Sequence, residues 1–82
     1  MSTRDTVRKY ILENYLFSDD QSALADDDSF LDKGIIDSTG ILEVIYFLED
    51  DFGITVEDDE MMPENLDSVN NIVSFIEKKQ AQ

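Results

Sequence analysis

Residues 34–54, GIIDSTGILEVIYFLEDDFGI, contain a serine at a position where a side chain can be modified. Asp37 and Ser38 follow a turn and stand at the start of an amphipathic helical pattern with an acidic outer face. A hydroxyl at a helix N-terminus is exposed, and the outward-pointing N–H groups and the helix dipole favour a phosphate attached there. The position therefore suits a phosphorylated or phosphodiester-linked Ser38. The competing interpretation is that Ser38 only caps the helix.

The composition excludes most of the chemistry that enzymes use. With 82 residues, the chain corresponds to one domain, residues 1–82, which has a modest core and no room for a deep catalytic cleft. It contains neither cysteine nor histidine. Disulfides, thiolate metal sites, a zinc site and a histidine general base are therefore excluded. We expect a protein that is not an enzyme.

The charge is strongly one-sided, with 20 acidic residues against 6 basic ones and a net charge of −14. Such a chain is repelled by nucleic-acid phosphates and by anionic membrane surfaces, so basic surfaces of other proteins are the expected partners. No apolar run approaches the roughly 20 residues of a membrane span. The N-terminal segment also lacks the apolar core of a secretory signal. We expect a cytoplasmic monomer.

Three segments have the apolar spacing of amphipathic helices, and none reads clearly as a strand. They cover residues 3–17, 38–52 and 68–79, and a short helix is expected near residues 58–66, where Pro63 suits a first turn. The positions on the inner faces are Val7, Tyr10, Ile11 and Asn14, flanked by Tyr15 and Phe17; Ile41, Val44, Ile45, Leu48 and Phe52; and Val69, Ile72, Val73 and Ile76. The pattern predicts a small all-α four-helix bundle.

Helix ends and one long connection complete this expectation. Thr3 is expected to cap the first helix, Gly53 to end the second, and Asp67 or Ser68 to cap the last. Residues 18–37, between the first two helices, form an unusually long loop for a compact domain. Its apolar residues should pin it to the core, with a glycine supplying a turn before the serine. These residues are Leu24, Phe30, Leu31, Ile35 and Ile36, with Gly34 as the turn.

The many acidic residues do not form a recognisable metal or acid–base site. In the window that begins at Asp26, Leu31 stands where an EF-hand loop needs glycine, and Asp37 where it needs glutamate. An EF-hand is therefore rejected, and no metal site is expected. The runs 49–51 and 57–60 consist of adjacent acids, whereas paired catalytic carboxylates need environments that differ. We interpret these runs as a solvated acidic face.

The second helix has an apolar pair outside its inner stripe. The pair and the acids near it are Leu42 and Tyr46, with Glu43, Glu49 and Asp50. An apolar pair ringed by acids, beside Ser38, predicts a docking patch for other proteins. The alternative is that the long loop covers the pair.

At these residues the sequence resembles the acyl carrier proteins, the family of phosphopantetheine-binding carriers. The match covers most of the chain, in the order helix, long loop, Asp-Ser at a helix start, acidic helix, short helix and final helix. The signature reads Asp37-Ser38-Thr39, followed by Leu-Glu-Asp-Asp-Phe-Gly at residues 48–53. The resemblance implies a four-helix bundle in which Ser38 carries 4′-phosphopantetheine, with Asp37 and Thr39 beside the attachment point.

The resemblance also implies a function and a set of partners. The thiol of the prosthetic group would hold acyl or aminoacyl groups as thioesters, which explains how a chain without cysteine could do thiol chemistry. A phosphopantetheinyl transferase would attach the group from coenzyme A. Adenylating ligases, synthases and transferases with basic patches would then bind the second helix. The partner-binding positions of the family correspond to Leu42, Glu43, Tyr46, Glu49 and Asp50.

The two residues after the serine differ from the pattern of fatty-acid synthesis. Thr39 stands where carriers of that pathway usually have leucine, and Gly40 follows it. The sequence is closer to stand-alone carriers that serve acyl- or aminoacyl-adenylating ligases, D-alanyl carriers among them. We expect an acyl carrier for a specialised lipid or secondary-metabolite pathway, with an aminoacyl, D-alanyl or peptidyl carrier as the alternative. An alternative of another class is an unmodified, acidic, helical module that binds proteins.

Overall fold

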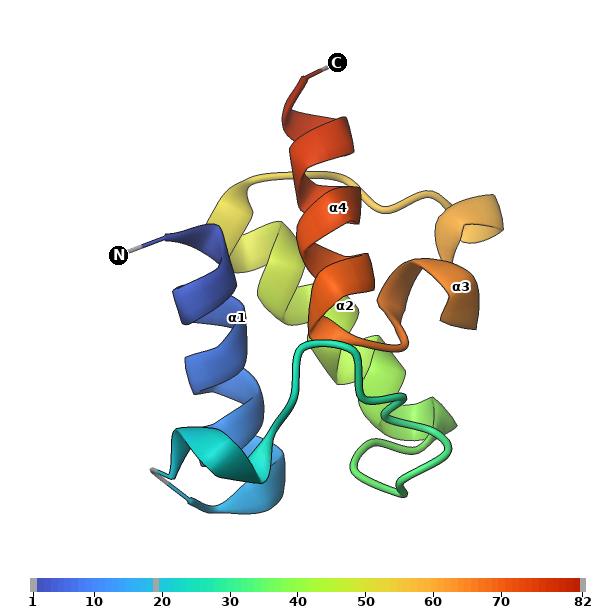
Figure 1. The fold of residues 1–82 in the computed structure, drawn as a ribbon. Helices are drawn as coiled ribbons and strands as arrows, with labels where there is room; N and C mark the ends of the chain where they lie inside the picture. Colours follow the sequence, from blue (N-terminus) through green and yellow to red (C-terminus); the bar gives the residue numbers. More distant parts are fainter. Residues whose placement is uncertain (1, 19, 82) are drawn as a thin grey trace.

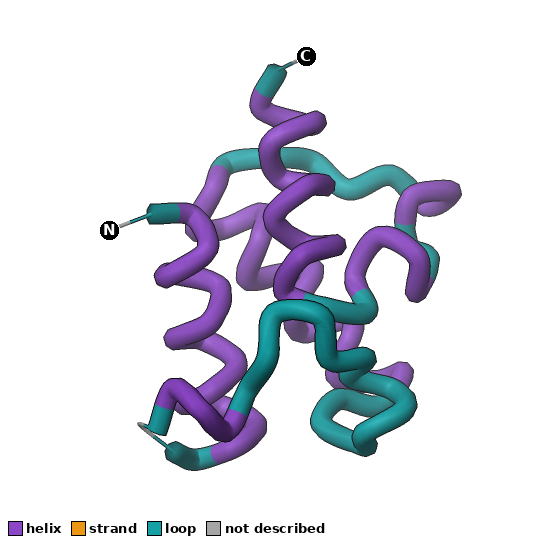
Figure 2. The backbone as a smooth tube through the Cα atoms, in the orientation of Figure 1, coloured by secondary structure: helices purple, strands orange, loops and turns teal. Residues whose placement is uncertain are grey.

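The computed structural model describes residues 2–18 and 20–81, and within them the chain forms helices and connecting segments without a strand (Figures 1 and 2). In Figure 1, α4 stands between α1 and α3, and α2 crosses behind it. The expected small all-α helical bundle is confirmed. In chain order the elements are α1 (Thr3–Ile11), the π-helical turn η1 (Leu12–Leu16), the 3-10 turn η2 (Gln21–Ala23), α2 (Ser38–Phe52), the 3-10 turn η3 (Asp58–Glu60), α3 (Pro63–Leu66) and α4 (Val69–Gln80).

The ends of the long helices follow local side-chain chemistry. The Ser2 hydroxyl accepts a hydrogen bond from the Asp5 backbone N–H at 3.1 Å, so the expected cap at Thr3 is wrong by one residue. Ser68 caps α4 in the same manner, and Gly53 ends α2 with a left-handed φ of 65°. Both of these assignments were expected. A serine or a glycine at such positions satisfies backbone groups that the helix leaves unpaired.

The first helix changes its geometry before it ends. From Leu12 the backbone forms a π-helical turn, which closes at Phe17 with a φ of 51°. The wider turn rotates the following side chains around the helix axis. Leu12, where this turn begins, is buried, whereas Asn14 and Phe17, both expected on or beside the inner face, are exposed, Phe17 by 84%.

The core combines the helices with apolar residues from the connections. Ile41, Phe52 and Tyr10 are only partly buried and pack at its edge. Residues such as Ile54 and Val56 were not anticipated because they lie in segments without helical spacing. The buried apolar side chains are Val7, Ile11, Leu12, Leu24, Phe30, Ile36, Val44, Ile45, Leu48, Ile54, Val56, Leu66, Val69, Ile72, Val73, Phe75 and Ile76.

The long connection between η1 and α2 is anchored by apolar side chains, as expected. Leu24, Phe30 and Ile36 are buried, and Gly34 makes its turn with a φ of 67°. Leu31 is the exception, because 39% of it is exposed. This side chain contributes to a surface pocket described below and does not pack in the core.

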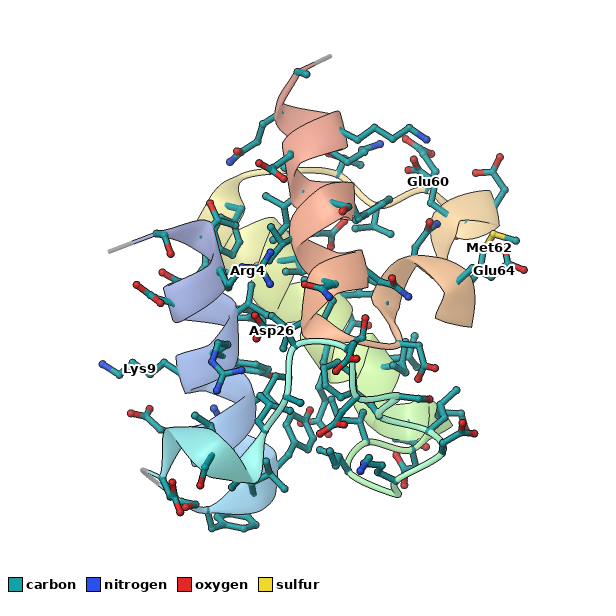
Figure 3. All side chains as sticks on the ribbon, in the orientation of Figure 1. Arg4, Lys9, Asp26, Glu60, Met62 and Glu64 are labelled. Carbon is teal, nitrogen blue, oxygen red and sulfur yellow. The ribbon has the colours of Figure 1, made fainter. Side chains whose placement is uncertain are left out.

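A cluster of charged and amide side chains fastens the middle of this connection to α1 and α4. One guanidinium nitrogen of Arg4 lies 2.8 Å from an Asp26 carboxylate oxygen, and one of Arg8 lies 2.5 Å from the other. Figure 3 shows Arg4 and Asp26 side by side between the two helices. Arg4 also donates to the Asn70 side chain at 2.6 Å, and the Asn70 backbone N–H donates to the Asp26 carbonyl. The loop is therefore tied to both helices at one residue.

Asp67 holds the next part of the connection instead of capping α4. Its carboxylate accepts hydrogen bonds from the Ser29 hydroxyl at 2.5 Å and from the Leu31 backbone N–H at 3.0 Å. Its carbonyl accepts one from the Phe30 backbone N–H at 2.7 Å. These bonds fix the loop just before it reaches α2.

The expected short helix over residues 58–66 is interrupted. It consists of η3 and α3, and Pro63 is the first residue of α3, as its fixed φ and missing N–H favour. A proline also disfavours helical geometry in the residue before it, which explains the break. Glu60 at the end of η3 accepts a hydrogen bond from the Lys79 ammonium of α4 at 2.7 Å. That contact joins η3 to the last helix.

Candidate functional site

At the start of α2 the N-cap and the exposed serine are two different residues, Asp37 and Ser38. Asp37 has extended backbone geometry, and its carboxylate accepts a hydrogen bond from the Gly40 backbone N–H at 2.7 Å. Ser38 is the first residue of the helix and is exposed. The interpretation of Ser38 as the cap is therefore wrong, because Asp37 fills that role. Across residues 2–18 and 20–81, no side chain forms a hydrogen bond with the Ser38 hydroxyl.

A shallow apolar pocket of about 180 Å³ lies beside Ser38. Two of its walls come from outside α2: Leu31 from the long connection and Met61 from the segment after η3. Sequence reasoning missed both as site residues, because an apolar side chain in a loop is normally assigned to the core. The residues that line the pocket are Leu31, Ser38, Ile41, Leu42, Ile45 and Met61.

The long connection leaves the outer face of α2 open. Leu42 is 47% exposed and Tyr46 is 67% exposed, so the alternative in which the loop covers them is wrong. The structure brings Leu42 to the pocket of Ser38. Tyr46, Glu43 and Asp50 face a different groove, of about 450 Å³, toward α1. The proposed docking residues therefore divide between two neighbouring faces of one helix.

Glu49, also expected in the docking patch, has an internal contact. Its carboxylate accepts a hydrogen bond from the Val56 backbone N–H at 3.0 Å, and the residue is partly buried. Val56 lies in the irregular segment after α2, where a backbone N–H has no helical partner. The carboxylate of Glu49 thus helps to hold this segment against the helix.

The inner side of the first turn of α2 packs against Tyr15. The Tyr15 hydroxyl donates to the Gly40 carbonyl at 3.3 Å. Burial raises the pKa of the Tyr15 phenol, and the Tyr10 hydroxyl and the carboxylates of Glu43 and Asp37 raise this pKa further. The phenol therefore stays protonated, and remains a hydrogen-bond donor, at neutral pH.

The exposed Ser38 hydroxyl has one carboxylate as its neighbour in the sequence, that of Asp37, which accepts the Gly40 backbone N–H. Histidine and cysteine are absent from the chain, and the described residues contain no cluster of three or more side chains able to hold a metal ion. None of the described helices is long and apolar enough to cross a membrane. The fold and site together define a small helical protein with an exposed serine in the first turn of α2.

Comparison with known proteins identifies the family of this chain. No model of a protein family matches the chain. The D-alanyl carrier protein of Streptococcus suis is 39% identical over 76 residues, 93% of this chain and 92% of the relative. That of Streptococcus equi subsp. zooepidemicus is 39% identical over 80 residues, 98% of each chain. The acyl carrier protein of Exiguobacterium sibiricum is 45% identical over 58 residues, 71% of each chain.

These identities extend over most of the chain and of its relatives. The chain therefore belongs to the carrier protein family, which includes the acyl and D-alanyl carrier proteins. The resemblance recognised around Ser38 is confirmed at the level of the family. Carrier proteins are not catalysts, so the chain is not an enzyme.

Proposed function

We propose that this chain, as a single carrier domain over residues 1–82, carries acyl or aminoacyl groups as thioesters on a 4′-phosphopantetheine attached to Ser38. The observation that carries the proposal is the position of the Ser38 hydroxyl, exposed in the first turn of α2 and not used to cap it. Acyl and D-alanyl carrier proteins generally bear this prosthetic group, which supports the assignment. The proposed location is the cytoplasm.

The residues around Ser38 suit such a group. In the transfer reaction the Ser38 oxygen attacks the β-phosphate of coenzyme A and forms a phosphodiester, while adenosine 3′,5′-bisphosphate leaves. We assign the base that takes the hydroxyl proton to the transferase, because the neighbouring carboxylate, that of Asp37, already accepts the Gly40 backbone N–H. The start of a helix favours the negative charge of the phosphodiester. The bound group supplies the thiol that holds the cargo.

The size of the neighbouring pocket bears on the cargo. At about 180 Å³ it is smaller than the roughly 300–1,000 Å³ of common small-molecule sites. Phe30 and Leu48 are completely buried in the core, and Ile45, which lines the pocket, is almost completely buried as well. This packing supports a short cargo held at the surface. The relatives named D-alanyl carrier proteins make D-alanine the first aminoacyl group to test.

The proposed partners follow from the exposed face of α2. A phosphopantetheinyl transferase and an adenylating ligase would both need to reach Ser38. Leu42 and Tyr46 offer apolar contact, and Glu43 and Asp50 offer negative charge to basic partner surfaces. A synthase or transferase that receives the cargo would use the same face. We propose that Glu49, which bonds to Val56, contributes less to docking than the other four positions.

Intact-mass measurement tests the attachment. The purified chain is incubated with coenzyme A, Mg²⁺ and a broad-specificity phosphopantetheinyl transferase. We expect the mass of one phosphopantetheine on the wild type and on Ser22→Ala, which removes another exposed hydroxyl, but none on Ser38→Ala. A wild type without added mass, or addition that persists in Ser38→Ala, would contradict the proposal and support an unmodified interaction module.

A second measurement tests the cargo. The modified chain is offered, with ATP, either to a D-alanine-adenylating ligase or to a ligase for long-chain fatty acids. We expect a D-alanyl thioester that hydroxylamine releases. Loading by the fatty-acyl ligase alone would refute the short-cargo assignment and leave the attachment at Ser38 unaffected.

A further inference from the structure

The π-helical turn η1 contacts the start of α2 at a point that belongs neither to the Asp37 cap nor to the pocket beside Ser38. Tyr15, in the π-helical turn η1, donates its hydroxyl to the Gly40 carbonyl at 3.3 Å. Its ring also packs edge-on against Tyr10, with ring centroids 5.9 Å apart. Gly40 lies two residues after Ser38. The contact therefore joins two distant parts of the chain directly behind the serine.

Gly40 is buried at this contact and leaves no room for a side chain. A Cβ atom built on Gly40 would lie 2.6 Å from the Ile36 Cγ2 atom and 3.4 Å from the Tyr15 ring. Ile36 is itself buried and belongs to the segment that leads into α2. Ile36 and Tyr15 can pack this close to the helix because Gly40 has no side chain. This need for close approach accounts for a residue that helical propensity disfavours.

We infer that Tyr15, Ile36 and Gly40 form a latch that holds the first turn of α2 and so positions Ser38 for modification, an inference that rests on the function proposed above. The latch acts on the inner side of the turn, whereas Ser38 and Thr39 are exposed on its outer side. Its members do not touch the reacting atoms and are positioning residues. A hydroxyl held in one orientation meets the transferase in the reactive geometry more often than a mobile one does.

The geometry of η1 supports a positioning role. Single π-helical turns are rare and frequently occur at functional sites. Here the turn contains Tyr15 and ends at Phe17, a non-glycine residue with a positive φ, which is itself uncommon. The π-helical turn and the positive φ of Phe17 are thus two uncommon backbone conformations within two residues of Tyr15.

Tyr15→Phe tests the latch while keeping the ring. Thr6→Val is the control, because it removes another hydroxyl that donates to a backbone carbonyl, that of Ser2 at 3.1 Å, at the start of α1 and away from Tyr15. We expect Tyr15→Phe to lower the transferase's kcat/KM for the carrier about two- to tenfold, the range of one neutral hydrogen bond, and to leave the KM for coenzyme A unchanged. Amide exchange at residues 38–41 should accelerate by a similar factor, while exchange in α4 should not change. Thr6→Val should have neither effect.

Gly40→Ala provides a second test, because the latch and helical propensity predict opposite changes in the rate of amide exchange. Alanine is the better helix former, so propensity predicts slower exchange in the first turn. The latch predicts faster exchange and a larger loss of kcat/KM than in Tyr15→Phe, because the new Cβ displaces Ile36. Slower exchange in a folded Gly40→Ala chain would count against the latch.

Two outcomes separate the latch from the proposed function. If the wild type is loaded and Tyr15→Phe matches it in kcat/KM and in exchange at residues 38–41, the latch is overturned and the attachment site stands. If the wild type is never loaded, the proposed function fails, and the exchange measurement alone decides whether Tyr15 holds the turn. A Gly40→Ala chain that does not fold leaves the decision to Tyr15→Phe.

Discussion

Replacing Asp37 with alanine should destabilise the protein, whereas replacing the adjacent Ser38 should not. The Asp37 carboxylate accepts the Gly40 backbone N–H at 2.7 Å, and loss of such a cap costs about 1 kcal/mol. Its negative charge at the helix N-terminus adds about 0.3–1 kcal/mol. The total of roughly 1–2 kcal/mol predicts a fall in Tm of at least about 4–8 °C for a chain of this size. Ser38→Ala removes an exposed hydroxyl outside the cap and should stay within about 0.5 kcal/mol of the wild type.

Thermal and urea unfolding, followed by far-ultraviolet circular dichroism, measure this difference. Asp37→Asn separates the two contributions, because asparagine caps a helix as well as aspartate does but carries no charge. We expect stability to fall in the order wild type and Ser38→Ala, then Asp37→Asn, then Asp37→Ala. Equal destabilisation by Ser38→Ala and Asp37→Ala would refute the reasoning, since it would make the Ser38 hydroxyl the cap.

Two further predictions concern the charge pairs that hold the loops. Asp26→Ala should cost about 1–2 kcal/mol in urea unfolding, because Arg4 and Arg8 both lose their contacts with this partly exposed carboxylate. Unchanged amide exchange in residues 24–30 of that variant would contradict a clamp at Asp26. The hydrogen bond from Lys79 holds the pKa of the Glu60 carboxyl below its ordinary value. The pair therefore stabilises the fold above the ordinary glutamate pKa and loses this contribution as the pH falls through the lowered pKa. The urea midpoints of wild type and Glu60→Gln should differ near neutral pH and converge below about pH 4, and parallel curves would refute the pairing.

The second helix was predictable in full because several signals agree along it. An unbroken apolar stripe, the Asp-Ser start and the stop at Gly53 gave its observed bounds, residues 38–52. The end of the first helix was not predictable, because counting at 3.6 residues per turn assumes a regular helix. Within the π-helical turn Leu12 is buried and Asn14 is exposed, which reverses the expected order.

The site shows a similar division between local and tertiary information. Ser38 and its exposure follow from local sequence, and its modification remains a prediction. Leu31 could not be assigned to the pocket, because a loop sequence does not reveal which apolar residues turn outward. Glu49 was counted as a surface acid, although its partner is a backbone N–H from a segment without regular structure. Such contacts depend on where the chain returns after the helix, which periodicity does not encode.

Four of the six basic residues of this chain form ion pairs with its own carboxylates. Arg4 and Arg8 contact Asp26, Lys33 contacts Asp28 and Lys79 contacts Glu60, and the chain as a whole has a net charge of −14. A basic partner therefore meets an attractive field from almost any direction, which speeds arrival. Departure is governed by short-range apolar contact, and Leu42 and Tyr46 offer little of it. We expect short-lived complexes whose rate of formation falls steeply with salt and whose lifetime hardly changes, which fits the proposed function of presenting a cargo to several enzymes in turn.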